Sequence, residues 1–333
     1  MNMEEIVALS VKHNVSDLHL SNAWPARWRK RGRMERAPFT ATDITGLLAD
    51  WLDEGQQAAL RQNGQLDFAV SLADNQRLRA SAFHQRQGTS LALRLLPTQC
   101  PTLETLGTPS VLPELLRSEN GLILVTGATG SGKSTTLAAM VTWLNQHIDG
   151  HILTLEDPIE YIYTSQRCLI QQREAGLHCA SFATGLRAAL REDPDVILLG
   201  ELRDSETIRL ALTAAETGHL VLATLHTRGA AQAIERLIDS FPAQEKDPVR
   251  SQLAGSLRAV LSQKLEPDKQ EGRVALYEQL INTPAAGNLI REGKSHQLPH
   301  VIQTGQQMGD DDLCPEPATA TGTRTALSNV WDQ

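Results

Sequence analysis

Apolar and polar residues alternate along four short segments in the first part of the chain. Residues 16–20, 66–72, 77–83 and 90–96 each show this period of two, which is typical of strands with one buried face. Residues 40–62, between the first two segments, carry apolar side chains at spacings of three and four, which predicts a helix. Strands mixed with a helix in this order indicate an α+β domain built on a sheet.

The pattern changes after about residue 114, where short apolar runs alternate with amphipathic helical segments. This alternation predicts an α/β fold with a mostly parallel sheet that is covered by helices on both faces. The strands are expected at residues 122–126, 151–155, 196–199 and 219–224, and the helices at residues 134–144, 182–191 and 205–217.

Beyond about residue 229 the helical pattern dominates. Val249, Leu253, Leu257 and Val260 have the spacing of one buried helical stripe. Residues 310–333 combine an acidic run, prolines and a stretch rich in threonine, alanine and glycine, so we expect a disordered tail there.

A chain of 333 residues is long enough for two domains. Residues 98–113 are rich in proline, threonine and glycine and lack periodicity, which is typical of a linker. We therefore expect an N-terminal domain at residues 1–97, this linker, and a second domain with a helical C-terminal part at residues 114–309.

Composition and charge narrow the class of protein. Hydrophobic residues make up 41% of the chain and charged residues 21%, as in ordinary globular proteins. No run approaches the ~18 uninterrupted apolar residues of a membrane span, and Glu4 and Glu5 stand where a signal peptide would be apolar. We expect a cytoplasmic protein. The formal charge of −8 argues against nucleic acid as the main partner, because its phosphates attract basic surfaces.

One basic cluster departs from this acidic balance. It is compatible with a solvated strand–turn–strand, or with a surface that docks to an acidic partner or a membrane. Its members are Arg27, Arg29, Lys30, Arg31, Arg33 and Arg36.

The four cysteines are scattered and form no C-x-x-C pair, so we expect free thiols rather than a zinc site or a disulfide framework. They are Cys100, Cys168, Cys179 and Cys314.

The strongest chemical signal is the segment GATGSGKS at residues 127–134, which fits the pattern G-x-x-x-x-G-K-[ST] between an expected strand and helix. Glycines let main-chain N–H groups curl around phosphate oxygens, and the helix N-terminus adds partial positive charge. We expect Lys133 to reach the β- and γ-phosphates and Ser134 to bind Mg²⁺, so that the chain binds and hydrolyses Mg–ATP. The expected nucleotide-binding residues are Gly127, Ala128, Thr129, Gly130, Ser131, Gly132, Lys133, Ser134 and Thr135.

Carboxylates follow two of the expected strands. Glu201 comes just after the apolar run 196–199, in the position of a Walker B acid that orders the water shell of Mg²⁺. A helix N-cap or a surface acid is the alternative. Glu156, Asp157 and Glu160 lie on a proline-containing turn, where one of them is expected to polarise the attacking water. A solvated acidic turn is the alternative there.

His219 and His226 lie near the ends of the expected strand 219–224. A histidine on a strand is either a core residue with satisfied hydrogen bonds or, at the C-terminal end of the strand beside Thr224 and Thr227, as His226 is, a sensor of the γ-phosphate.

Three arginines lie on expected strands of the first domain. They are either solvent-facing sheet residues or cations supplied to the γ-phosphate of a neighbouring site, where they would stabilise transition-state charge. Spacing alone leaves both interpretations open. These residues are Arg77, Arg79 and Arg94.

Together these segments resemble the secretion and pilus motor ATPases of the GspE/PulE family, and most closely its type IV pilus retraction (PilT-like) members. The resemblance runs from about residue 16 to about residue 304. It rests, in chain order, on SDLHL, RLRASAF, GATGSGKSTTLAAM, HILTLEDPIEY, LRAALREDPDVILLGELRD and LALTAAETGHLVLATLHT.

The resemblance implies a PAS-like N-terminal domain, a RecA-like ATPase domain and a ring hexamer with nucleotide at domain and subunit junctions. It makes residues 127–134 the Walker A motif, Glu201 the Walker B acid and metal ligand, and Glu160 the catalytic base. His226 matches the family's His box, with His219 beside it. The arginines that the N-terminal domain would supply to the ATP site are Arg77, Arg79 and Arg94.

The resemblance also bears on the output of the motor. Assembly and type II secretion motors carry an extra N-terminal region and a four-cysteine metal site, which this sequence does not show. Retraction members carry an AIRNLIRE-type motif, and residues 285–292 read AAGNLIRE, with Ala286 and Gly287 in place of isoleucine and arginine.

We therefore expect a hexamer that turns ATP hydrolysis into domain rotation and disassembles a pilus through an inner-membrane platform protein. Membrane contact is expected to be peripheral. The alternatives are an assembly or type II secretion motor, and a ring scaffold that binds nucleotide without turnover.

Overall fold

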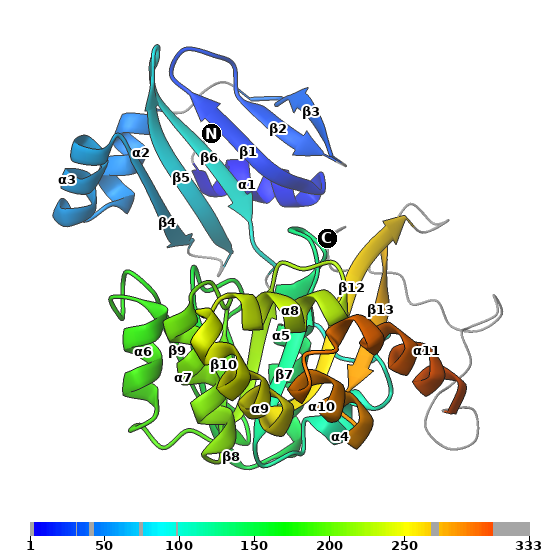
Figure 1. Ribbon diagram of the computed structural model, residues 1–333. Helices are drawn as coiled ribbons and strands as arrows, with labels where there is room; N and C mark the ends of the chain where they lie inside the picture. The colour runs from blue at the N-terminus through cyan, green and yellow to red at the C-terminus, as the bar shows by residue number, and fades with distance from the viewer. Residues whose placement is uncertain are drawn as a thin grey trace. The chain divides into compact units, whose positions relative to one another are not determined.

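The computed structural model describes residues 3–30, 32–39, 43–72, 76–97, 99–267 and 273–308, without the side chains of residues 304–308. These residues fall into two compact units. The first comprises residues up to Gln99 together with Glu160–Ile162, and the second runs from Cys100 to Ile159 and again from Tyr163. In Figure 1 the strands and helices of the first unit are blue to cyan, and most of the second unit is green to orange.

The first unit is built on an antiparallel sheet with the strand order β3-β2-β1-β6-β5-β4. One face of the sheet carries buried residues such as Leu18, Leu78 and Leu93 and packs against three helices. The strands are β1 (Val15–Ser21), β2 (Arg27–Lys30), β3 (Arg33–Arg36), β4 (Gln65–Ser71), β5 (Arg77–Gln85) and β6 (Gly88–Leu95), and the helices are α1 (Met3–Lys12), α2 (Ile44–Trp51) and α3 (Glu54–Asn63).

The single helix expected at residues 40–62 is wrong, because the chain breaks between α2 and α3. The Asp53 side chain accepts a hydrogen bond of 2.8 Å from the N–H of Gln56, whose own side chain bonds back to the N–H of Asp53. Such a capping box starts a new helix. Residues 40–42 lie outside the described residues.

The basic cluster forms the β2–β3 hairpin at one edge of this sheet, which confirms the predicted strand–turn–strand. The register places Arg27 opposite Arg36 and Lys30 opposite Arg33. Like charges directly opposite each other are unfavourable in a sheet. Arg31 lies outside the described residues, and docking to an acidic partner or a membrane stays a prediction.

The second unit is built on a mostly parallel sheet with the strand order β13-β12-β7-β11-β10-β8-β9, in which β12–β13 is an antiparallel pair. The mixed α/β class that the sequence predicts is therefore confirmed. The strands are β7 (Gly121–Thr126), β8 (Gly150–Glu156), β9 (Cys168–Glu174), β10 (Val196–Leu199), β11 (Leu220–Leu225), β12 (Leu257–Pro267) and β13 (Arg273–Ile281).

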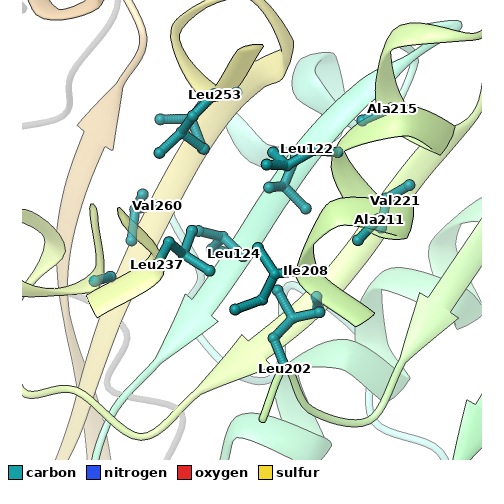
Figure 2. Packing of buried hydrophobic residues seen from close by; sticks show 14 of the residues in the cluster. Leu122, Leu124, Leu202, Ile208, Ala211, Ala215, Val221, Leu237, Leu253 and Val260 are labelled. Atoms are coloured by element: carbon teal, nitrogen blue, oxygen red, sulfur yellow. The ribbon is translucent and has the colours of Figure 1, made fainter. Parts of the chain in front are cut away.

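Helices cover both faces of this sheet. Successive residues of β7 therefore point into two different hydrophobic cores, one on each face. Leu122 and Leu124 pack with helices α6 to α11, as Figure 2 shows for part of that cluster. Ile123 and Val125 pack with α4 and α5 on the other face. The helices are α4 (Leu112–Leu115), α5 (Lys133–His147), α6 (Phe182–Ala189), α7 (Ser205–Glu216), α8 (Ala230–Asp239), α9 (Lys246–Ser256), α10 (Pro284–Arg291) and α11 (Leu298–Met308), with short 3₁₀ turns η1 (Ala243–Glu245) and η2 (Ser295–Gln297).

Two expectations for this unit differ from the structure. The predicted helical stripe ends with α9 at Ser256, and Leu257 and Val260 lie on β12, which pairs with β7 and β13. The residues expected as a linker, 98–113, supply Leu103 and Leu106 to the core under α5. Burial of these leucines makes the segment part of the second unit, which begins at Cys100.

Cys100, Cys168 and Cys179 form no disulfide among the described residues, whereas Cys314 and the tail lie outside the described part of the chain. None of the described helices has both the length and the apolar character needed to span a lipid bilayer.

Candidate functional site

The glycine-rich segment connects the C-terminal end of β7 to the first turn of α5. Strand β7 is buried along its whole length between β11 and β12. Gly127, Gly130 and Gly132 have φ angles of 152°, 78° and 87°, which favour glycine. Ala128 and Thr129 at the tip are exposed. The loop thus presents its main chain at the N-terminus of a 15-residue helix, an arrangement that binds phosphate.

Lys133 folds back over this loop from the start of α5. Its ammonium Nζ donates to the carbonyl oxygens of Gly127 at 2.9 Å and Ala128 at 3.0 Å. The residue is 8% exposed, whereas the adjacent Ser134 is exposed. The ammonium of Lys133 and the exposed hydroxyl of Ser134 therefore come from adjacent residues at the mouth of the loop.

Glu201 and His226 meet at the same edge of the sheet. Glu201 follows β10 and His226 follows the neighbouring strand β11, which pairs with β7. The Nε2 atom of His226 lies 3.1 Å from Oε2 of Glu201, and its Nδ1 atom lies 3.4 Å from Nζ of Lys133. The fold thus connects three residues that the sequence analysis singled out in separate motifs.

Arg203 completes this group, and the sequence analysis missed it although it stands two residues after Glu201. It forms an ion pair with Glu201 and lies 3.7 Å from Oδ2 of Asp157. Burial by itself raises the pKa of Glu201, but the hydrogen bond and charge of Arg203, together with His226, outweigh it and lower the pKa overall. Glu201 is therefore a carboxylate at neutral pH and can attract a cation.

The three carboxylates after β8 have separate environments. Glu156 is buried and accepts hydrogen bonds from Oγ1 of Thr154 at 2.7 Å and Nε2 of Gln172 at 3.2 Å. Asp157 faces Arg203. Glu160, the expected base, groups with the first unit rather than the second. Its catalytic role stays a prediction.

The three arginines gather on one face of the first unit's sheet. Arg79 on β5 lies directly opposite Arg94 on β6, and Arg77 is two residues along the same strand. Residues two apart on a strand point to the same side. Nε of Arg94 donates to Oδ1 of Asp17 at 2.8 Å. The structure thus brings these arginines together, and their contact with a nucleotide stays a prediction.

His219 does not lie beside His226. It precedes β11, whereas His226 follows that strand, so a six-residue strand of about 20 Å separates them. Nδ1 of His219 lies 3.1 Å from the carbonyl oxygen of Ala214 at the end of α7. His219 therefore lies at the amino-terminal end of β11, away from the phosphate loop, which adjoins the C-terminal ends of the strands.

Gln263 on β12 is a second residue that the sequence analysis missed. Its side-chain amide contacts the carbonyl oxygen of Ser131 in the loop and the hydroxyl of Thr136 in α5. An apolar run followed by Ser262 and Gln263 is typical of a buried strand that continues into polar residues, whereas the helical spacing of the residues before it predicts a helix there.

The residues at this edge fit a triphosphate and a divalent cation. A Cβ added to Gly130 would meet no atom within 4 Å, so the loop borders open space. Exposed main chain and the Lys133 ammonium suit phosphate oxygens. The hydroxyl of Ser134 and the carboxylate of Glu201 are oxygen donors of the kind that Mg²⁺ prefers.

A mostly parallel sheet with this phosphate loop defines a P-loop nucleotide-binding protein. The family model described as "Type II/IV secretion system protein" matches residues 11–269, and the chain belongs to that family. It is 84% identical over 309 residues to the uncharacterized protein YggR of Escherichia coli (strain K12), covering 93% of this chain and 95% of that one.

Pilus proteins are also close relatives. The chain is 46% identical over 327 residues to the type IV pilus retraction ATPase PilT of Pseudomonas aeruginosa, covering 97% of this chain and 95% of the relative. The crystal structure of the pilus retraction motor PilT with bound ADP matches with a TM-score of 0.86 and 43% identity, covering 91% of this chain and 90% of that one. The resemblance to PilT-like proteins is thus confirmed, and the chain has the PilT type of ATPase fold.

Proposed function

We propose that this protein is a motor ATPase that hydrolyses Mg–ATP as a ring hexamer and drives the retraction of type IV pili. The observation that carries the proposal is the connection of Lys133, His226 and Glu201 at the mouth of the phosphate loop. The similarity to PilT supports the pilus as the object of the motor.

Each residue of this group has a distinct task in the proposed reaction. The main chain of residues 127–132 and Lys133 hold the phosphates, while Ser134 and Glu201 hold the cation. Mg²⁺, when bound, neutralises charge on the phosphate oxygens. His226 contacts both the lysine and the carboxylate, which supports a role in reporting a change at the γ-phosphate to Glu201.

The remaining parts of the proposal come from the family resemblance. Glu160 is the general base that takes the proton of the attacking water. Arginines of a PAS-like N-terminal domain stabilise the charge of the transition state in a RecA-like domain. Closure of domains and subunits around ATP, followed by opening, then supplies the motion. The arginines are Arg77, Arg79 and Arg94.

Steady-state phosphate release tests the enzymatic part. The wild type is expected to turn over Mg–ATP, and Lys133→Ala is expected to abolish turnover. Lys264→Ala is a matched control, because Lys264 lies in the same unit with a 67% exposed side chain paired to Glu266. A wild type that forms hexamers with Mg–ATP, yet turns over no faster than Lys133→Ala, would support a nucleotide-dependent scaffold instead.

Deletion of the gene in a piliated cell tests the direction of the motor. Loss of a retraction motor leaves excess surface pili, and complementation with the wild type but not with Lys133→Ala should restore the normal number. Bald cells would indicate an assembly motor. The proposal also places the protein in the cytoplasm, in contact with the pilus platform protein at the inner membrane.

A further inference from the structure

A buried glutamine joins the phosphate loop to the helix that follows it. Gln263 lies on β12 and is 5% exposed. Its Nε2 atom donates to the carbonyl oxygen of Ser131 at 2.7 Å, and its Oε1 atom accepts from Oγ1 of Thr136 at 2.7 Å. Ser131 belongs to the loop and Thr136 to α5, so one amide links the two elements.

Strand β12 also approaches the loop closely, through both the main chain and the side chain of Gln263. A Cβ on Gly127 would lie 2.3 Å from the carbonyl oxygen of Gln263, and a Cβ on Gly132 would lie 2.8 Å from its Nε2 atom. Gly130, by contrast, borders open space. Two of the three loop glycines thus face β12, and the loop rests on this strand as well as enclosing the phosphate position.

The partner strand reaches the same threonine. Tyr277 lies directly opposite Gln263 in the β12–β13 hairpin, and its hydroxyl is 3.4 Å from Oγ1 of Thr136. Thr136 is fully buried. Its hydroxyl is therefore fixed by two side chains from the hairpin, and that hydroxyl holds the Gln263 amide against the loop.

We propose that Gln263 is a positioning residue that holds the phosphate loop in its binding conformation before nucleotide arrives. This inference rests on the proposed function, because it presumes that the loop binds nucleotide. A loop that is ordered in advance avoids the entropic cost of ordering during binding. Gln263 acts through Ser131 and Thr136. The stabilisation that Gln263 gives to the loop is therefore the same in the bound ground state and in the transition state. Its loss should lower the affinity for nucleotide and leave kcat unchanged.

The first test is Gln263→Leu, which removes both amide hydrogen bonds and keeps a similar volume. We expect the Kd for Mg–ADP and the KM for ATP to rise about tenfold, which corresponds to ~1.4 kcal/mol. The kcat should stay within about twofold of the wild type, since the loop is ordered once nucleotide is bound. Gln252→Leu is the control, because it also removes a glutamine hydrogen bond, to Glu216 at 2.7 Å, without touching the loop. It should leave the Kd unchanged.

Thr136 supplies a second, independent test. Thr136→Val removes the hydroxyl at the same volume and should weaken Mg–ADP binding, whereas Thr136→Ser should restore it. In the double variant with Gln263→Leu, the two losses should be less than additive, because both changes break the same contact.

The outcomes separate this inference from the proposed function. A wild type that binds no Mg–ADP overturns the proposed function and this inference with it. A wild type that binds, with Gln263→Leu folded and binding equally well, overturns the inference alone. A Gln263→Leu variant that loses kcat at unchanged KM also overturns the inference alone. If Gln263→Leu fails to fold, a wild-type Kd for Thr136→Val overturns the inference.

Discussion

The Nε2 atom of His226 lies 3.1 Å from Oε2 of Glu201, so the imidazole and the carboxylate form one hydrogen-bonded pair at the edge of the sheet. The other ring nitrogen, Nδ1, faces the ammonium of Lys133 at 3.4 Å. An ammonium can only donate, so a hydrogen bond between Lys133 and the ring requires Nδ1 to accept, and Nε2 then carries the hydrogen that Glu201 receives. The imidazole thus lies between Lys133 and Glu201 and contacts both.

His226→Ala is expected to lower ATP turnover at saturating nucleotide by about ten- to a hundredfold. This range corresponds to the loss of a charge-assisted hydrogen bond of roughly 1.5–3 kcal/mol. The Kd for Mg–ADP should change little, because the loop and Lys133 remain. Phosphate release and ADP titration measure the two quantities.

His219→Ala provides the matched control for that experiment. His219 adjoins the same strand at its other end, where it contacts Ala214. Its removal should leave kcat near the wild-type value. Equal losses of turnover in the two variants would show that the strand, and not the contact between His226 and Glu201, governs hydrolysis.

The lowered pKa of Glu201 predicts a pH dependence of stability. A carboxyl whose pKa is lowered by folding stabilises the fold above its unfolded pKa of about 4.3, and this contribution is lost as the pH falls through the lowered value. Arg203→Gln removes the main group that lowers this pKa. The free energy of unfolding of the wild type should therefore exceed that of the variant near neutral pH, and the two should converge as the pH falls below about 4.

Urea unfolding of both proteins between neutral pH and acid measures this difference. Arg187→Gln is the control, since the ion pair of Arg187 with Glu206 is largely exposed and such pairs contribute little. A difference between wild type and Arg203→Gln that stays constant with pH would contradict the assignment to Glu201.

The sequence predicts the strands that carry the site because β7, β10 and β11 are short apolar runs, each followed by a polar motif. It does not predict β12, because periodicity alone cannot distinguish a short buried strand from a buried helix. Leu257 and Val260 happen to continue the spacing of α9. The sequence therefore does not single out Gln263, since its contact with Ser131 depends on how β12 pairs with β7.

Gly127→Ala is expected to destabilise the protein more than Gly130→Ala does. Both residues have positive φ angles, 152° and 78°, which an alanine adopts only at a cost of ~1–3 kcal/mol. A Cβ at Gly127 also lies 2.3 Å from a main-chain oxygen of β12, which cannot rotate away, whereas a Cβ at Gly130 meets no atom within 4 Å. Overpacking of this kind adds roughly 1–3 kcal/mol. The free energy of unfolding, measured without nucleotide, compares the two. Equal losses would mean that β12 moves away from the loop at little cost.

Leu253→Ala is expected to lower the free energy of unfolding by about 2–5 kcal/mol, because it leaves a cavity in a well-packed core. Leu253 on α9 is fully buried in the cluster that packs helices against the sheet, as Figure 2 shows together with Leu122 and Val260. Leu276→Ala makes the same chemical change in the same unit, at a β13 residue that is 40% exposed, and should cost less than half as much. Urea unfolding monitored by circular dichroism measures both. Similar losses would show that the second unit does not depend on the packing of α9 within this cluster.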